Sequence, residues 1–225
     1  MTHSIRNSVT ILLIALLISA STAQSSAQTV SCALRVLHTF SSFDIRAASG
    51  SMTPGTITLG YGIAGIANVE FSRHCALQGE IIYSSSTHTF REEDAERQIS
   101  VKYLHIPILA VFNTGTSDPV NIHLEAGPQF GLNVGSAMTL SGSNLSPQGA
   151  VLAVRSTDIG IAYGIGMDVG IDPLNLLRLT LGFRGVAGLT PMGDTSGTLT
   201  PNSYYILSAA SRDSYSGYIG LSLGF

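Results

Sequence analysis

The chain has few charged side chains. Asp, Glu, Lys and Arg make up 11% of its 225 residues, whereas about 25% is usual in soluble proteins. Hydrophobic residues make up 44%, and 24 residues are glycine. This composition is unlike that of a soluble enzyme of similar size. It suits strands that have a small, neutral inner face and an apolar outer face in contact with lipid.

Two further features are missing. The sequence has no block of Lys and Arg and its net charge is −3, so nucleic acid is not an expected partner. Beyond residue 27, no apolar run approaches the roughly 18 residues that a membrane helix needs. A chain that spans a membrane without such a helix must do so as a closed barrel, because only closure leaves no unpaired backbone groups in lipid.

Residues 1–27 have the pattern of a signal peptide. Arg6 marks the positive end, residues 9–18 form the apolar segment, and small residues precede a cleavage site after Ala27. Cleavage after Ala23 is the alternative. The sequence therefore predicts an exported protein.

Two other interpretations of this end are weaker. A membrane anchor would need a longer apolar segment. A lipoprotein modified at Cys32 lacks the Leu and the small residues that should precede the cysteine. The mature protein is expected to be a single domain, residues 28–225.

The most regular stretch runs from Asp158 to Asp172. Apolar side chains occupy one parity, and Gly, Asp and Ala occupy the other. A period of two predicts a β-strand, and this strand is much longer than the usual 5–6 residues or so. The apolar parity consists of Ile159, Ile161, Tyr163, Ile165, Met167, Val169 and Ile171. In a membrane barrel this face meets lipid and the small face lines the lumen.

The same alternation predicts eight strands. They lie at residues 33–46, 56–72, 76–89, 99–113, 120–138, 158–172, 176–189 and 214–225. The first is the least clear. In the fourth, Pro107 predicts a bulge. Leu104 and the apolar residues after it should face lipid, which puts Lys102 inside only if the alternation breaks near Tyr103.

The connections between these strands alternate in length. Short turns are expected at 73–75, 114–119 and 173–175, and longer loops at 47–55, 90–98, 139–157 and 190–213. This is typical of outer-membrane barrels, which have periplasmic turns and extracellular loops. We therefore predict an all-β, eight-stranded, antiparallel up-and-down transmembrane barrel in the bacterial outer membrane, with both ends in the periplasm.

The last strand resembles the C-terminal signal of outer-membrane proteins, which ends in an aromatic residue and is read by the barrel-insertion machinery. Its outward residues are Tyr215, Ile219, Leu221, Leu223 and Phe225. This resemblance makes the insertion machinery an expected partner.

Three segments resemble the outer-membrane β-barrel domain of the PorT-like family and, more distantly, OmpA/OmpX-type barrels. They are residues 80–84 (EIIYS), 103–109 (YLHIPIL) and 124–128 (LEAGP). The likeness covers most of the mature chain, and it places Pro107 inside an accepted strand. At His105 the sequence departs from the acidic residue usual in the family. The resemblance implies a role in assisting an envelope or secretion complex.

The inward parity carries charged and polar side chains, which are Glu70, Glu80, His123, Glu125, Asp168, Arg178 and Arg184. The interior of an eight-stranded barrel is just wide enough for side chains to fill, and charges there must be paired or hydrated. Three strands that follow one another in the chain carry Glu125, Asp168 and both arginines. We therefore expect these four to form a buried ion-paired plug; a gated polar conduit is the alternative.

Cys32 and Cys75 are the only cysteines. The predicted topology places both near the periplasmic rim, one before the first strand and one at the start of the third. Because an exported protein reaches a disulfide-permissive compartment, a bond between them is a hypothesis, and two free thiols are the alternative.

The predicted function is structural, anchoring or interactive, and the protein is expected to be a monomer without cofactor or metal. Expected partners are outer-membrane lipid, lipopolysaccharide and an extracellular or envelope protein. A small pore or transporter is the first alternative. An outer-membrane lipid hydrolase is a weaker one, based on Ser86, His88 and Glu92 near the outer rim.

Overall fold

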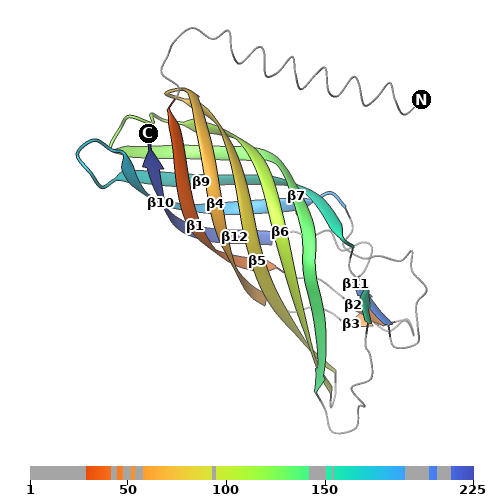
Figure 1. The fold of residues 1–225 in the computed structure, drawn as a ribbon. Helices are drawn as coiled ribbons and strands as arrows, with labels where there is room; N and C mark the ends of the chain where they lie inside the picture. Colours follow the sequence, from red (N-terminus) through yellow and green to blue (C-terminus); the bar gives the residue numbers. More distant parts are fainter. Residues whose placement is uncertain are drawn as a thin grey trace, which may run out of the picture.

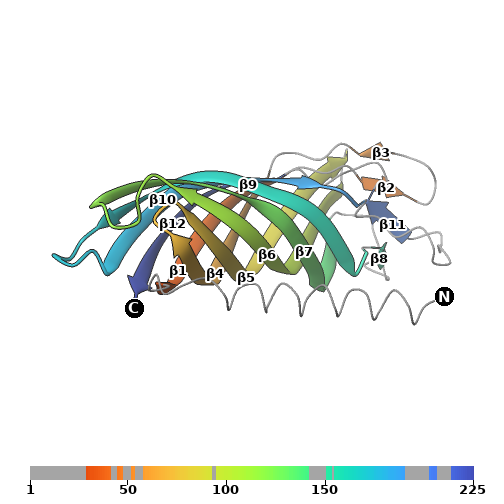
Figure 2. The same ribbon diagram turned by 90° about the horizontal axis from the view of Figure 1, so that it is seen from above.

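Eight antiparallel strands close into a barrel (Figure 1, Figure 2). The computed structural model describes residues 29–41, 45–47, 52–53, 58–92, 95–141, 151–153, 155–190, 203–206 and 214–225. The barrel strands are β1 (Val30–Ser41), β4 (Thr58–Ser72), β5 (Cys75–Glu92), β6 (Ala95–Asn113), β7 (Val120–Ser141), β9 (Thr157–Gly170), β10 (Leu177–Gly188) and β12 (Ser214–Gly224). Each lies beside its neighbours in the chain, and β12 closes against β1. The predicted up-and-down barrel is confirmed.

The predicted signal peptide, residues 1–27, lies outside the described residues. Those described contain no helix long and apolar enough to cross a membrane.

Along β9, residues that face lipid alternate with residues that face the lumen. Ile159, Ile161, Tyr163 and Ile165 are between 42% and 51% exposed, while the Gly, Ala and Asp residues between them are buried or half-buried. This is the reverse of a soluble protein, in which large apolar residues are inside. The closed wall leaves the apolar face to lipid and makes the lumen the core.

Three strands run differently from the prediction. β1 begins at Val30 and ends at Ser41, so Cys32 lies within it. β5 and β6 continue outward as far as the pair Glu92 and Ala95, so the predicted loop 90–98 is the end of a hairpin. Outside the membrane a strand needs no apolar face, so the period-two signal fades there.

Pro107 produces no bulge. The register between β6 and β7 is the same on both sides of it, with Pro107 opposite Gln129 and Ala110 opposite Ala126. The ladder instead skips the two positions between these pairs. Because Pro has no N–H to donate, the strand loses ladder bonds there without gaining a residue.

The bulge of this strand pair lies nearer the outer end. Tyr103 is opposite Asn133 but Lys102 is opposite Gly135, so Val134 is the extra residue and belongs to β7. The alternation in β6 is therefore unbroken, and Lys102 faces outward on the same side as the apolar residues that follow it.

A second, four-stranded sheet lies apart from the barrel wall (Figure 1). It has the order β3-β2-β11-β8 and is built from β2 (Ile45–Ala47), β3 (Met52–Thr53), β8 (Val151–Ala153) and β11 (Ser203–Ile206). β3, β8 and β11 come from predicted outer loops, whereas β2 begins within the end of the predicted first strand, residues 33–46. All four segments have four residues or fewer, too few to show a period of two, so the sequence did not predict them.

Aromatic side chains mark two levels on the outward face. The outer level comprises Phe40, Tyr61, Tyr83, Phe130 and Tyr215, and the inner level Phe71, Phe112 and Phe225. On β4, Tyr61 and Phe71 are ten residues apart. At about 3.3 Å per residue and a tilt of about 40°, this corresponds to roughly 25 Å, the height of the apolar band of outer-membrane barrels.

Candidate functional site

Four buried charges cross the middle of the lumen. They are Arg35 on β1, Glu80 on β5, Glu125 on β7 and Arg184 on β10, each between 2% and 5% exposed. In the circular strand order β10 lies opposite β5, and β1 lies opposite β7. Each arginine therefore reaches from one wall to a carboxylate on the facing wall. We call these four residues the central cluster.

Arg184 has the most contacts in the central cluster. Its Nη1 and Nη2 donate to the two Glu80 carboxylate oxygens at 2.6 and 2.7 Å. Its Nε and Nη2 donate to Glu125 Oε1 at 2.8 and 2.6 Å. One guanidinium thus binds two carboxylates through the planar, two-point geometry that makes arginine suited to such pairs.

Arg35 completes the charge balance and was not predicted. Its Nη1 lies 3.3 Å from Glu80 Oε1 and 3.5 Å from Glu125 Oε2, and its guanidinium stacks 4.5 Å from the centre of the Tyr218 ring. The polarity of β1 alternates poorly, because Leu37 points inward and His38 outward. The charge balance was the available signal, since the inward acids need a further cation.

Glycines directly opposite on the neighbouring strands make room for these long side chains. A Cβ on Gly164 would lie 2.8 Å from Glu125 Oε1, and one on Gly220 would lie 2.6 Å from Arg35 Cγ. At Gly166 and Gly182 the space is taken by His123 and Tyr218. The small residues on the inward face of β9, which the sequence pattern predicts, therefore leave the space that Glu125 and His123 occupy.

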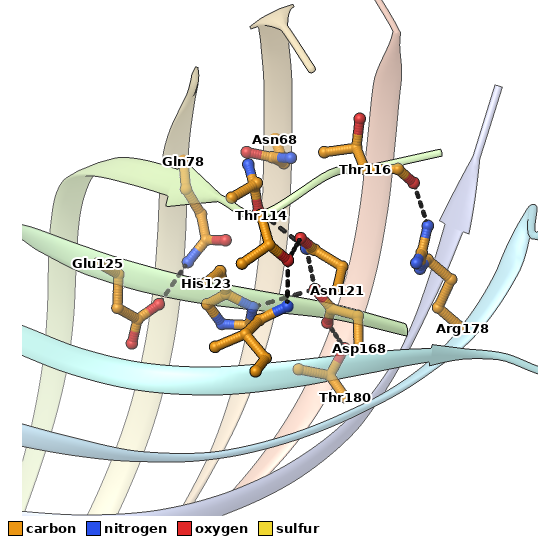
Figure 3. Close-up of polar contacts among 12 residues, drawn as sticks. Asn68, Gln78, Thr114, Thr116, Asn121, His123, Glu125, Asp168, Arg178 and Thr180 are labelled. Carbon is orange, nitrogen blue, oxygen red and sulfur yellow. Dashed lines mark hydrogen bonds and ion pairs between the residues drawn. The ribbon is translucent and has the colours of Figure 1, made fainter. Parts of the chain in front are cut away.

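A second polar layer lies toward the short turns (Figure 3). Asp168 accepts hydrogen bonds from Thr180 Oγ1 at 2.7 Å and from Asn121 Nδ2 at 3.1 Å, and it lies 3.0 Å from His123 Nδ1. The other ring nitrogen of His123 is 3.2 Å from the Tyr218 hydroxyl. His123 and Tyr218 thereby connect this layer to the central cluster.

Arg178 does not join the expected ion-paired network. Its Nη1 and Nη2 donate to the backbone carbonyls of Thr116 and Asp118, in the turn between β6 and β7. Glu70 lies near it and beside Thr116. Of the four charges expected to form one plug, Glu125 and Arg184 pair, Asp168 binds polar neighbours, and Arg178 fastens the turn.

A cavity of about 640 Å³ opens between this layer and the short turns. It is lined by polar side chains that include Asn68, Glu70, Asn113, Asn121, Asp168 and Arg178. In outer-membrane barrels the short turns face the periplasm, so this is a periplasmic vestibule. The central cluster lies at its inner end.

The predicted disulfide is not formed. Cys32 and Cys75 are both free and exposed. On β4, Ala67 stands opposite Cys32 and Ser72 opposite Cys75. Five residues of strand correspond to about 17 Å at about 3.3 Å per residue, far beyond the roughly 7 Å between Cα atoms that a disulfide tolerates.

The hydrolase alternative gains no support from the geometry. Ser86 lies on the inward side of β5, with Glu80, rather than toward lipid. The side chains of His88 and Glu92 lie outside the described ones. Within the described ranges, no group of three or more His, Cys, Asp or Glu side chains is arranged to hold a metal ion.

A closed barrel with an apolar outer face, two aromatic levels and an ion-paired lumen defines a transmembrane protein of the bacterial outer membrane. The chain belongs to the family described as outer membrane protein beta-barrel domain, whose model matches residues 23–194. That family is described by its barrel and not by a reaction. The match ends before β12, the strand that closes the barrel against β1.

Solved structures of outer-membrane barrels have a similar fold. The outer membrane protein OprG from Pseudomonas aeruginosa is 12% identical with a TM-score of 0.56, over 88% of this chain and 95% of that one. Neisserial surface protein A is 16% identical with a TM-score of 0.48, over 87% and 97%. At these identities the likeness concerns the fold alone. Among curated proteins, no match was found.

Proposed function

We propose that the protein is a closed, non-conducting barrel that anchors a binding surface outside the cell. The observation that carries this proposal is the central cluster. Two guanidiniums and two carboxylates meet across the barrel axis, with Gln78 Nε2 donating to Glu80 at 2.6 Å and to Glu125 at 3.2 Å. An ion that passed through would have to separate pairs that are shielded from water, which is costly.

The strands β5, β6 and β7 supply the anchored surface. They have 18, 19 and 22 residues, whereas about 9–11 residues are enough to cross the membrane. They run beyond the other barrel strands on the side of the outer connections (Figure 1). A three-stranded ribbon of this kind would present residues well clear of the lipid surface.

The expected partner, the monomeric state and recognition by the insertion machinery are part of the same proposal. The likeness of residues 80–84, 103–109 and 124–128 to PorT-like barrels supports a partner in an envelope or secretion complex. The closed wall has no strand edge for a second copy to complete, which supports a monomer. The resemblance of residues 214–225 to the C-terminal signal of outer-membrane proteins supports recognition by the insertion machinery.

Conductance in planar lipid bilayers tests the proposal. The wild-type protein, shown to be folded by its faster migration on cold SDS gels, should give no unit currents. Stable unit currents from this folded protein would overturn it in favour of a small pore. As a control for the assay, Arg35→Ala/Glu125→Ala should conduct, since it removes one cation and one anion that face each other across the lumen.

A further inference from the structure

Lys102 on β6 is a charged side chain on the outward face of the barrel. Among the outward-facing barrel positions whose side-chain burial the structure describes, it is the sole Asp, Glu, Lys or Arg. Arg91 and Glu96 have the same outward parity at the outer ends of β5 and β6 and stand opposite each other, but their side chains lie outside the described ones. Lys102 is exposed and makes no ion pair with a described residue. A charge on this face is tolerated only near the edge of the membrane, so the position of Lys102 is informative.

Lys102 lies at the outer edge of the apolar band. It is ten residues from Phe112 along β6, the same spacing that separates the two aromatic levels on β4. Its neighbours across the strands are Ser85 on β5 and Gly135 on β7. The ammonium group therefore lies at the level of the headgroups of the outer leaflet.

The bulge in β7 directs this side chain. The extra residue, Val134, brings Gly135 to the outward face beside Lys102. A Cβ on Gly135 would lie 3.8 Å from Lys102 Cδ, so the aliphatic stem of Lys102 lies next to β7. Because Gly135 has no side chain, nothing on that residue blocks the stem.

A second basic residue lies on the far side of β7. Asn133 N–H donates to the Ser156 carbonyl at 2.9 Å, which places the adjacent Arg155 near the level of Gly135. Arg155 is exposed and, like Lys102, makes no ion pair with a described residue. Two strand spacings, about 10 Å in all, separate their backbones. Side chains as long as lysine and arginine can meet on one anion over this distance.

We propose that Lys102 and Arg155 bind a phosphate group of lipid A, the membrane anchor of lipopolysaccharide. The outer leaflet of this membrane presents phosphate at the level of these residues, and its acyl chains would cover the apolar band below. Arginine and lysine are the residues that pair with phosphate in proteins. This site is independent of whether the lumen conducts.

Binding of fluorescently labelled lipid A to the purified protein in neutral detergent tests the proposal. Lys102→Gln/Arg155→Gln should weaken binding by about tenfold or more, whereas Lys102→Arg should retain it. Arg73→Gln is the matched control, because Arg73 is exposed in a short turn at the other end of the barrel and its loss should have no effect. Dephosphorylated lipid A should bind the wild type weakly.

Three outcomes would overturn the proposal. Unchanged affinity in the double variant would remove these residues from any lipid site. An equal loss in Arg73→Gln would mean that binding follows net charge alone. Displacement of lipid A by equimolar inorganic phosphate would mean a site for free anions and not for a lipid. Both variant positions are exposed, and faster migration on cold SDS gels checks that each variant is folded.

Discussion

The central cluster and the layer near the turns use the same residue types in different ways. In the cluster, Arg184 binds two carboxylates and no backbone group. Near the turns, Arg178 binds two backbone carbonyls and Asp168 takes Asn, Thr and His as partners. The two arginines are on the same strand and the same face of it.

Access to water accounts for the difference. The side chains of Glu80 and Glu125 are completely buried, whereas 16% of the Asp168 side chain is exposed. A charge without water needs an opposite charge and a full set of hydrogen bonds, while a charge beside a hydrated vestibule is partly neutralised by solvent. Depth in the lumen therefore decides which partners a side chain takes.

Removing Arg184 should have the largest effect. Arg184→Ala leaves two buried carboxylates with Arg35 as their only cation, and we expect a loss of about 3–5 kcal/mol in the free energy of unfolding. Urea unfolding in lipid vesicles, followed by circular dichroism, measures it.

Arg178→Ala is the control for this comparison. Its carbonyl partners can turn to water at the vestibule, so we expect a loss of about 1 kcal/mol. Equal losses in the two variants would contradict the view that depth sets the strength of these contacts.

The glycines beside the central cluster, on the neighbouring strands, should give a smaller effect. Gly164→Ala places a methyl group 2.8 Å from Glu125 Oε1 and 2.7 Å from the Phe183 carbonyl, and such overpacking typically costs about 1–3 kcal/mol. Gly217 faces outward with nothing within 4 Å of the added Cβ, so Gly217→Ala should change stability by less than about 0.5 kcal/mol. If both substitutions were equally tolerated in urea unfolding, the lumen would not be packed as described.

The smallest effect is expected at the rim, where Asp172 begins the turn between β9 and β10. Its carboxylate accepts the Leu177 N–H at 2.7 Å and the Leu174 N–H at 3.1 Å. Partial desolvation acts to raise the pKa of Asp172, but these backbone hydrogen bonds outweigh it and hold the pKa below the ordinary 3.8.

Because the pKa of Asp172 is lowered by folding, its contribution to stability is present above about pH 4 and is lost as the pH falls through the folded pKa. Asp172→Asn should therefore lower stability slightly at pH 7 and differ less from the wild type at pH 2. Urea midpoints measured from pH 7 to pH 2 test this. A difference between the two proteins that grows toward low pH would contradict the assignment.

Which residues face lipid could be predicted from the sequence. In β9, β10 and β12 the predicted inward and outward parities agree with the observed exposure, because the period of two is a local property of a strand. The prediction failed where this property is weak. β1 has a poor alternation, the outer parts of β5 and β6 need no apolar face, and β8 and β11 are too short to show a period.

The sequence by itself determined the barrel and the set of side chains that point into it. Only the tertiary structure decided how those side chains pair. Arg184 and Glu80 are 104 residues apart and meet because closure puts β10 opposite β5. Arg178 and Arg184 are equivalent in the sequence pattern, and only their depth in the lumen gives one a carbonyl site at the vestibule and the other the buried carboxylates. The local period of two determines whether a side chain points into the lumen or toward lipid. Its depth in the lumen and its partners across the barrel depend on the whole closed wall.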